Sequence, residues 1–302
     1  MNKIKNNLKL IGNTPLVKID IGIAKINLLA KLESYNLTGS IKDRMALYLI
    51  KKAQKKGWLK KGFNIIEATT GNTGIALAAL ANIYGYNLIV TIPEDVSKER
   101  IEILKLYGAK VILTPKAQGP KGAIKMRDKL ARKIPDSWAP SQFDNFDNLK
   151  SHELGIGKEI LNQVKGRIDY VVHGIGTGGT LMGISKVIKE NYPKVKIIAV
   201  EPEESAVLSG RKPGHHGIQG IGEGFVPKLV KRQLIDLVIR VSSHQAIVET
   251  KSLARTNGLL VGFSSGANIS AIKKLAKGIN KQVRIVTVFA DGGERYLSVL
   301  EN

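Results

Sequence analysis

Short apolar runs alternate with amphipathic stretches along the chain, and this alternation constrains the fold more than any other feature. Several runs, such as "NLIVTIP" at 87–93, are rich in Val and Ile, as in parallel strands covered on both faces. We expect strands at 26–33, 63–68, 87–93, 109–115, 168–176, 195–202, 236–242 and 283–291, and helices at 43–57, 73–84, 97–107, 120–133, 152–165, 180–191, 245–257 and 266–277. Each half carries its own strand–helix series, so the pattern predicts an α/β protein with two open, twisted, mostly parallel sheets and flanking helices. The pattern lapses near 141–148, where we expect the seam between the halves.

The composition excludes several classes of protein. The 302 residues suffice for one large or two modest domains. No apolar run approaches the roughly 18 to 20 residues of a membrane helix, and the N-terminus has no signal-peptide core, so we expect a cytoplasmic protein without a membrane partner. The chain has no cysteine, and its five histidines show no metal-binding spacing, so we expect no metal site.

The formal net charge of +22 raises the possibility of nucleic-acid binding. The lysines are nevertheless scattered, and the aromatic residues, 5% of the chain, are not interleaved with the basic runs as a base-stacking surface requires. We therefore expect a solvated lysine-rich surface and no nucleic-acid partner.

One lysine, Lys42 in "LTGSIKDRMA", occupies an unusual position. At about 100° per residue, Lys42 falls in the same apolar sector of its helix as Ala46, Ile50 and Ala53, whereas Arg44 points the other way. A buried lysine without a carboxylate partner tends to lose its proton and become nucleophilic. A first-turn lysine that reaches past the helix end into water is the alternative, and the helical pattern alone does not decide between them.

Two glycine-containing loops each follow a strand and open a helix. In the first, Thr69, Thr70, Gly71, Asn72 and Thr73 surround a helix N-terminus, which suits a carboxylate or phosphate, although Thr and Asn are also ordinary helix caps. The second, "GTGGT" at 176–180, suits a compact cradle for one phosphate.

The second loop also permits a dinucleotide reading. Gly174, Gly176 and Gly179 satisfy G-x-G-x-x-G, and Glu201 ends the next strand, where a ribose-binding acid would lie. Such a fingerprint would indicate an NAD-dependent oxidoreductase. That function remains a remote alternative, because it gives Lys42 and the 69–73 loop no role.

Taken together, these loops resemble the cysteine synthases (O-acetylserine sulfhydrylases) and the related cystathionine β-synthases, which have the tryptophan-synthase-β-like fold of pyridoxal-phosphate enzymes. The resemblance covers nearly the whole chain. Its motifs, in order, are "IGNTPLV" (11–17), "GSIKDR" (39–44), "TTGNTGIALA" (69–78), "QFDN" (142–145), "GIGTGGTLMGI" (174–184), "KPG" with "GIQGIGEGFVP" (212–227), "GFSSGA" (262–267) and "GERYLS" (293–298).

The resemblance implies that the cofactor is pyridoxal 5'-phosphate and that Lys42 is its Schiff-base lysine and the catalytic residue. It implies cofactor contacts from Lys42, Asn72, Gly176, Thr177, Gly178, Gly179, Thr180 and Ser264, and substrate contacts from Thr69, Thr70, Gly71, Asn72, Thr73, Gln142 and Gly220. It places residues 1–36 and 147–302 in a larger cofactor-binding domain, and 37–146 in a smaller mobile domain that closes on the substrate.

The activity that the resemblance implies is β-replacement on an activated serine, with sulfide, to give L-cysteine through an α-aminoacrylate intermediate. O-acetylserine is the expected donor. An O-phosphoserine-dependent synthase and a cystathionine- or lanthionine-forming β-synthase that uses serine or cysteine remain alternatives. A homodimer is expected by the same resemblance, and binding of the C-terminal tail of serine acetyltransferase is left open.

The chain departs from the family pattern at several positions. Leu37 and Thr38 replace a Pro-Gly pair before the lysine, and "HELGIGKEI" (152–160) lacks the usual Thr-Thr-Gly-Pro. Glu223 and Asp291 stand where the best-known synthases have small neutral residues. Both acids are candidate specificity residues that would repel an anionic substrate or bind an amino group, and solvated loop acids are the alternative.

Overall fold

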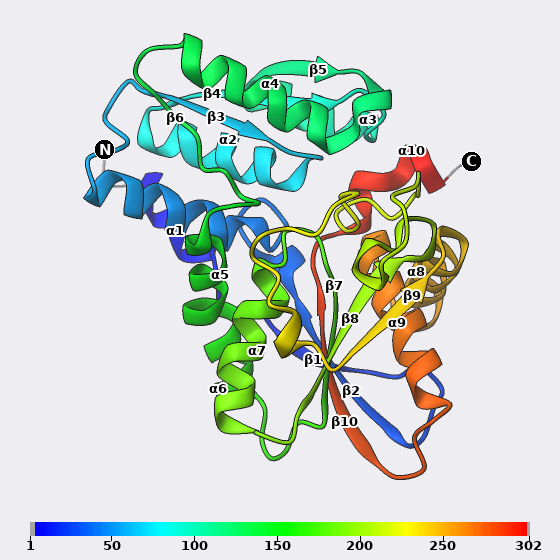
Figure 1. The fold of residues 1–302 in the computed structure, drawn as a ribbon. Helices are drawn as coiled ribbons and strands as arrows, with labels where there is room; N and C mark the ends of the chain where they lie inside the picture. Colours follow the sequence, from blue (N-terminus) through cyan, green and yellow to red (C-terminus); the bar gives the residue numbers. More distant parts are fainter. Residues whose placement is uncertain (1–3, 301–302) are drawn as a thin grey trace.

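The computed structural model describes residues 4–300 and contains two sheets (Figure 1). The strands are β1 (Leu16–Ile19), β2 (Ile26–Leu32), β3 (Asn64–Ala68), β4 (Asn87–Pro93), β5 (Lys110–Thr114), β6 (Ser137–Trp138), β7 (Tyr170–Gly174), β8 (Lys196–Pro202), β9 (Leu237–Val241) and β10 (Val283–Phe289). The larger sheet has the order β1-β2-β10-β7-β8-β9 and the smaller one β5-β4-β3-β6. Only β1 runs antiparallel to its neighbour among the described strands. The predicted fold class is therefore confirmed.

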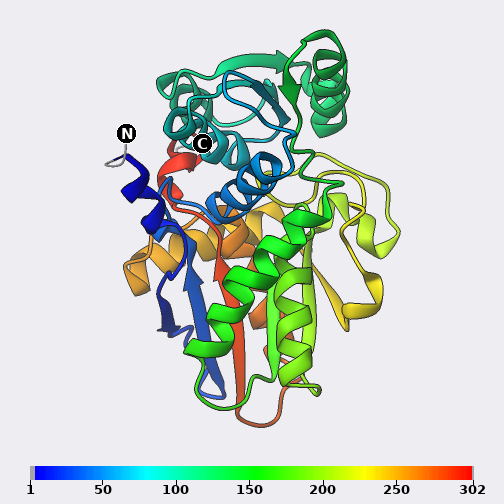
Figure 2. The same ribbon diagram turned by 90° about the vertical axis from the view of Figure 1, so that its left-hand side faces the viewer.

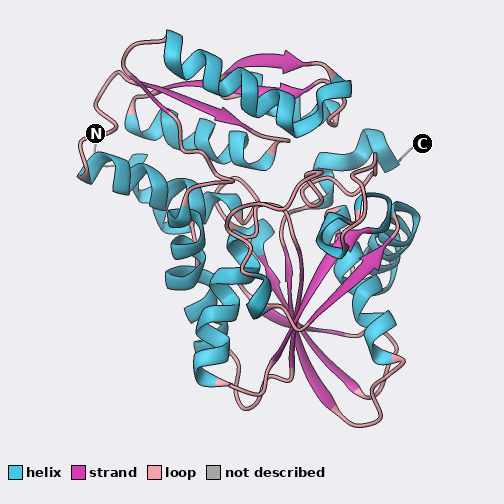
Figure 3. Ribbon diagram, in the orientation of Figure 1, coloured by secondary structure: helices cyan, strands magenta, loops and turns pink. Residues whose placement is uncertain are grey.

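Helices cover both faces of each sheet (Figure 3). They are α1 (Lys42–Lys55), α2 (Asn72–Tyr84), α3 (Lys98–Leu106), α4 (Gly119–Lys133), α5 (Phe146–His152), α6 (Lys158–Gln163), α7 (Gly179–Asn191), α8 (Ser243–Asn257), α9 (Phe263–Ala276) and α10 (Leu297–Leu300). On the larger sheet, α6 and α7 cover one face and α8 and α9 the other. On the smaller sheet, α2 faces the larger sheet and α4 lies on the opposite side (Figures 1 and 2). No described helix is both long enough and apolar enough to cross a bilayer.

Most of the expected elements appear within a few residues of their predicted bounds, and the exceptions are short. The edge strands β1 and β6 were not predicted, because four and two residues are too few to establish an alternation. The helix expected at 152–165 was wrong at its start: α5 begins at Phe146, inside the expected seam, where Asn145 caps it by accepting a hydrogen bond from the Asp147 amide at 3.0 Å. A π-helix at Glu153–Gly157 then joins α5 to α6.

The larger sheet takes its strands from 16–32 and 170–289, and the smaller sheet takes its strands from 64–138. The domain division at residues 36/37 and 146/147, and the mobility of the smaller part, remain predictions. The first three and last two residues of that division lie outside the described chain.

Helix α1 connects the two layers. Its apolar face, with Ala46, Ile50 and Ala53, is buried in the core of the smaller sheet. Arg44 points the other way, as predicted, but it is buried instead of solvated. It donates hydrogen bonds to Glu33 Oε2 and Glu159 Oε1, each at 2.5 Å. The helical pattern predicted the direction in which Arg44 points. It could not show that the larger sheet and its helices cover that side of α1.

Arg44, Glu33, Glu159 and Lys31 form a buried ionic cluster, the Arg44 cluster, which holds α1 against the larger sheet. Lys31 on β2 adds an ion pair to Glu159 at 2.7 Å. Burial alone would raise the pKa of Glu159, but its hydrogen bonds from Arg44 and Lys31 lower that pKa to about 2. The carboxylate is thus ionised at every pH at which the protein is expected to work, and it compensates the two buried cations.

Removal of the Arg44 guanidinium should destabilise the protein, because Glu33 then loses its buried cation and Glu159 keeps only Lys31. We expect Arg44→Ala to lower the free energy of unfolding by about 3 to 5 kcal/mol in urea denaturation. The exposed Lys55 on the same helix is the control, and Lys55→Ala should change stability by no more than about 0.5 kcal/mol. Equal stability of the two variants would contradict the bracing role of the cluster.

Candidate active site

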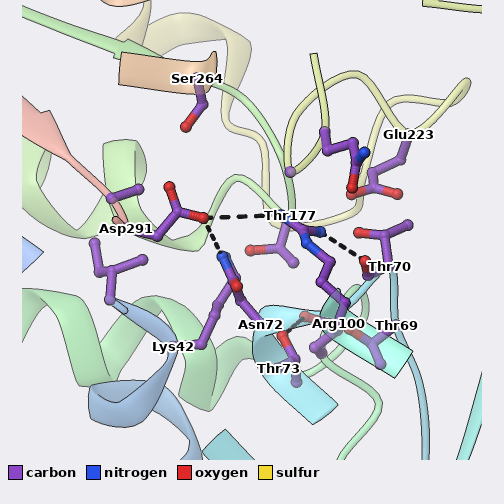
Figure 4. A pocket seen from close by; sticks show the side chains of 15 residues that line it. Lys42, Thr69, Thr70, Asn72, Thr73, Arg100, Thr177, Glu223, Ser264 and Asp291 are labelled. Carbon is purple, nitrogen blue, oxygen red and sulfur yellow. Dashed lines mark hydrogen bonds and ion pairs between the residues drawn. The ribbon is translucent and has the colours of Figure 1, made fainter. Parts of the chain in front are cut away.

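A cavity lies at the carboxyl ends of the strands, where loops of both sheets meet. It consists of two adjoining hollows of about 460 and 340 Å³, including their openings. Lys42, Thr177, Gly220 and Ser264 line both hollows. The predicted residues Thr69, Thr70, Asn72, Thr73, Gln142, Glu223 and Asp291 line the first, and Gly176, Gly178 and Thr180 line the second. Segments far apart in the sequence thus converge on one lysine (Figure 4).

Lys42 is the first residue of α1 and lies partly buried in the wall of the cavity. Desolvation lowers the pKa of its ammonium below the ordinary value for lysine. The nearby Glu223 and Asp291 carboxyls oppose this effect, and the Arg100 guanidinium adds to it. A larger fraction of Lys42 than of a surface lysine is therefore the neutral amine at a given pH. Of the two readings left open by the sequence, the structure favours the nucleophilic lysine over one that reaches into water.

The 69–73 loop forms the start of α2, and its shape is fixed by buried contacts. Gly71 has a φ of 145°, and a Cβ there would lie 2.4 Å from Arg100 Cδ, so a larger residue does not fit. The Gly71 amide donates to Thr69 Oγ1 at 2.9 Å, and Arg100 donates to the Thr70 carbonyl at 2.6 Å. The loop therefore presents the positive end of the α2 dipole to the cavity, which suits a carboxylate.

Gln142 braces this loop from the side. Its Nε2 donates to the Ala68 carbonyl at 2.8 Å, and its Oε1 accepts from the Thr73 hydroxyl at 2.6 Å. The backbone amide of Gln142 also donates to the buried Glu67 carboxylate at 3.1 Å. Gln142 thus lies in the wall of the cavity. Both polar atoms of its side-chain amide are hydrogen-bonded to the segment 68–73.

The 176–180 loop makes a close cradle at the start of α7. Gly178 caps the helix with a φ of 84°, in the left-handed region. A Cβ on Gly176 would lie 2.4 Å from the Gly220 carbonyl oxygen, and one on Gly179 would lie 2.2 Å from Asn148 Oδ1. Thr177 Oγ1 accepts from Asn148 Nδ2 at 3.0 Å. With no acidic residue in the first turn of α7, this glycine-lined helix start fits a phosphate group.

Ser264 lies in the first turn of α9, where it is buried and lines both hollows. Its side chain is a neutral hydroxyl, and the family resemblance implies that this hydroxyl contacts the cofactor. Together, an amine, a phosphate cradle and a neutral hydroxyl on one cavity match the functional groups of pyridoxal phosphate.

The dinucleotide reading finds no support in the geometry. The Glu201 carboxylate accepts hydrogen bonds from the amides of Leu208 and Ser209, at 2.8 and 3.1 Å, and from the Ser209 hydroxyl at 2.5 Å. Glu201 is buried and lines neither hollow. The acid expected to bind a ribose therefore organises the turn that follows β8.

Glu223 and Asp291 are not solvated loop acids: their exposed fractions are 9% and 1%. Asp291 Oδ2 accepts from Asn72 Nδ2 and from the Tyr296 hydroxyl, each at 2.6 Å, and lies 3.8 Å from the Arg100 guanidinium. Burial raises the pKa of Glu223 to about 7, although Lys42 and Arg100 favour its charged form. The two acids therefore line the cavity and are shielded from bulk water.

The sequence reasoning missed three residues that support the site: Arg100, Arg295 and Tyr296. The Arg100 guanidinium lies 4.8 Å above the Tyr296 ring and donates to its hydroxyl at 2.6 Å. Arg295 donates to Asn72 Oδ1 at 2.5 Å and also to the Thr38 carbonyl. A signal for Arg100 was present, because it precedes the buried Leu104 by one helical turn on the same face of α3.

The altered flank before Lys42 contacts the cavity only indirectly. Thr38 donates from its amide and hydroxyl to the buried Asp43 carboxyl, at 2.6 and 2.5 Å, and neither Leu37 nor Thr38 lines a hollow. Burial raises the pKa of Asp43 to about 6, against these hydrogen bonds. Leu37 and Thr38 still form a turn, in which the Gly39 amide donates to the Asn36 carbonyl at 2.9 Å, and Thr38 reaches the site through Arg295.

Comparisons with known proteins agree with this geometry. The family described as "Pyridoxal-phosphate dependent enzyme" matches residues 8–291. A cysteine synthase of Staphylococcus aureus is 44% identical over 300 residues, which cover 98% of this chain and 96% of that protein. The crystal structure of the O-acetylserine dependent cystathionine β-synthase from Helicobacter pylori is similar with a TM-score of 0.93 at 40% identity, covering 97% of this chain and 96% of that one. A hydrogen sulfide-producing enzyme from Fusobacterium nucleatum has a TM-score of 0.93 at 44% identity, covering 99% and 92%.

The cradle makes a direct prediction about cofactor retention. Gly176→Ala places a methyl group against the fixed carbonyl of Gly220, so the loop must shift and the cradle opens. We expect the purified variant to retain less than about a tenth of the pyridoxal phosphate bound per chain by the parent protein, measured by visible absorbance. Gly278→Ala is the control, since a Cβ there meets nothing closer than 3.9 Å. Full retention in the Gly176 variant would contradict the assignment of this loop.

Proposed function

This chain belongs to the family of pyridoxal-phosphate dependent enzymes, and we propose that it makes L-cysteine by replacing the acetoxy group of O-acetylserine with sulfide. The observation that carries the proposal is the position of Lys42. Its desolvated amine lies in one cavity with a phosphate cradle on one side and a carboxylate-binding helix start on the other. This arrangement suits removal of a proton next to a carboxylate.

The residues that would hold the cofactor come from four elements, α1, α2, the start of α7 and α9. Lys42 would carry it covalently, the 176–180 loop would hold its phosphate, and Ser264 and Asn72 would face the polar atoms of its ring. Bound pyridoxal phosphate withdraws electrons from the α-carbon of an attached amino acid. A neutral serine does not enforce a positive charge on the ring nitrogen, and we infer that this favours prompt loss of the β-substituent.

Lys42 supplies the base. When its Nζ is not bound to the cofactor it would be a free amine, and desolvation, which lowers its pKa, increases the fraction of that amine able to accept the α-proton. Lys42 is the first residue of α1 and lines both hollows, so its amine would hold this proton within the cavity. The same proton can return to carbon when the nucleophile has added.

The 69–73 loop would orient the donor by its carboxylate. The amides at the start of α2, with the hydroxyls of Thr69 and Thr70, supply hydrogen bonds and a favourable dipole. Because this loop belongs to the smaller sheet and the cradle to the larger, we propose that the part spanning 37–146 closes on the substrate and excludes water.

Two features of the cavity favour O-acetylserine over O-phosphoserine. Glu223 and Asp291 both line the first hollow, and a phosphate leaving group would bring up to two further negative charges near them. An acetyl group is neutral and avoids that repulsion. A cationic counterpart is present in Arg100, but its guanidinium is already engaged with the Thr70 carbonyl and the Tyr296 hydroxyl.

We also propose a cytoplasmic homodimer and recognition of the C-terminal tail of serine acetyltransferase. The dimer and the recognition of the tail rest on the family resemblance. The tail would enter the cavity with its terminal carboxylate at the α2 start, where it would compete with the donor. Light scattering of the purified protein tests the dimer, and inhibition by a peptide of that tail tests the competition.

A matrix of donors with sulfide tests the proposed activity. We expect L-cysteine to form from O-acetylserine at least about tenfold faster, as kcat/KM, than from O-phosphoserine or serine, because of leaving-group chemistry and charge. Products are identified by mass spectrometry, and Lys42→Ala serves as the inactive control. Consumption of O-phosphoserine in preference to O-acetylserine would overturn the donor assignment, and absence of cysteine with every donor would overturn the function.

A further inference from the structure

His173 is a buried imidazole in the cofactor cavity to which the proposed function gives no part. It lies near the end of β7, is 5% exposed and lines the second hollow together with Lys42 and Ser264. Among the described residues that line this hollow, His173 and Lys42 are the ionisable ones, and none carries a carboxyl group. The two acids of the cavity, Glu223 and Asp291, line the first hollow instead.

The side-chain amide of Asn268 fixes which nitrogen of His173 carries the proton. Asn268 Nδ2 donates to the Val288 carbonyl at 3.0 Å and lies 3.3 Å from His173 Nδ1. Because a carbonyl oxygen can only accept, the nitrogen of the amide must face Val288, and its second hydrogen is then available to His173 Nδ1. Nδ1 is therefore the acceptor, and the proton of the neutral ring is on Nε2.

The imidazole of His173 stays neutral in this position. Desolvation, with a smaller contribution from the nearby Lys42 ammonium, lowers the pKa of His173 to about 3. A second ring proton would also have to occupy Nδ1, where it would meet the N–H of Asn268. Within the described part of the chain, no residue accepts a hydrogen bond from Nε2. His173 thus offers a neutral N–H donor to whatever fills the second hollow.

The contact with Asn268 places His173 on the ring side of the site and not on the phosphate side. Ser264 and Asn268 are four residues apart on α9, so they lie on the same face of that helix. Figure 4 shows the Ser264 side chain pointing from α9 into the cavity. The phosphate cradle belongs to α7, which covers the opposite face of the larger sheet. His173 is therefore attached to the side of the hollow on which Ser264 lies.

We propose that His173 faces the ring-nitrogen side of bound pyridoxal phosphate and, with Ser264, surrounds it with neutral hydrogen-bond donors, so that the ring nitrogen stays unprotonated. A carboxylate beside the pyridine nitrogen would favour its protonated form, whereas a neutral N–H or O–H donates to its lone pair. His173 thereby shares the effect on the ring that the proposed function assigns to Ser264. The inference rests on the proposed function for the cofactor alone, since neither the serine derivative nor the sulfur nucleophile enters it.

Nitrogen-15 NMR of the holoenzyme, loaded with pyridoxal phosphate that is labelled at its ring nitrogen, tests the inference. An unprotonated pyridine and a pyridinium have well-separated chemical shifts, and we expect the parent protein to give the signal of the unprotonated form. His173→Glu introduces a carboxyl group beside the ring and should move the signal towards the pyridinium form. His244→Glu, at an exposed position on α8, is the matched control and should leave the signal unchanged.

Two neutral variants separate the hydrogen bond from packing, and they decide the matter if a buried glutamate prevents folding. His173→Leu removes the donor, and we expect the cofactor to leave the holoenzyme roughly two- to tenfold faster during dialysis, the contribution of one hydrogen bond. His173→Gln keeps an N–H near the position of Nε2 and should restore retention to within about twofold of the parent. In both variants the ring nitrogen should remain unprotonated.

The outcomes separate this inference from the proposed function. A pyridinium signal in the parent protein would overturn the inference, as would an unprotonated signal in folded His173→Glu. Equal cofactor retention in the parent and His173→Leu would overturn the hydrogen bond from His173. If any of these results is found while cysteine still forms, the inference fails alone. A parent protein that binds no pyridoxal phosphate would overturn the proposed function as well.

Discussion

The withdrawal of the Lys42 amine from bulk water is the physical constraint on which the rest of the site depends. Desolvation lowers the pKa of Lys42, and a neutral amine is what both covalent attachment and proton removal require. The position is created by α1, whose first residue lies in the cavity wall while its apolar face packs in the smaller layer. The buried ion pairs of Arg44 hold the opposite face of α1 to the larger layer.

Two helix starts then define what can bind beside this amine. The α7 start is glycine-lined and free of acids, and the α2 start is held in shape by Arg100 and Gln142. Because the two helix starts belong to different sheets, the site is complete only where loops of both sheets meet. The C-terminal segment takes part as well, since Arg295 contacts Asn72 and Thr38 from beyond β10.

The sequence predicted the fold class and the long elements because burial on both faces leaves a strong apolar pattern. It also singled out Lys42, the two loops, and the unusual acids Glu223 and Asp291. It did not predict the burial of those acids, nor the bracing by Arg295 and Tyr296. Such contacts join residues about two hundred positions apart in the chain, as in the Arg295–Asn72 hydrogen bond, and no local periodicity encodes them. The short edge strands β1 and β6 were not predicted, because so few residues cannot establish an alternation of apolar and polar side chains.

Borohydride reduction of the purified protein, followed by peptide mass mapping, shows which residue carries the cofactor. We expect the pyridoxyl phosphate group to become fixed to one residue, Lys42, among the 47 lysines and arginines of the chain. The unreduced protein should absorb in the visible range and lose that absorbance on reduction. A colourless protein with no mass gain at Lys42, or attachment at a different lysine, would contradict the account.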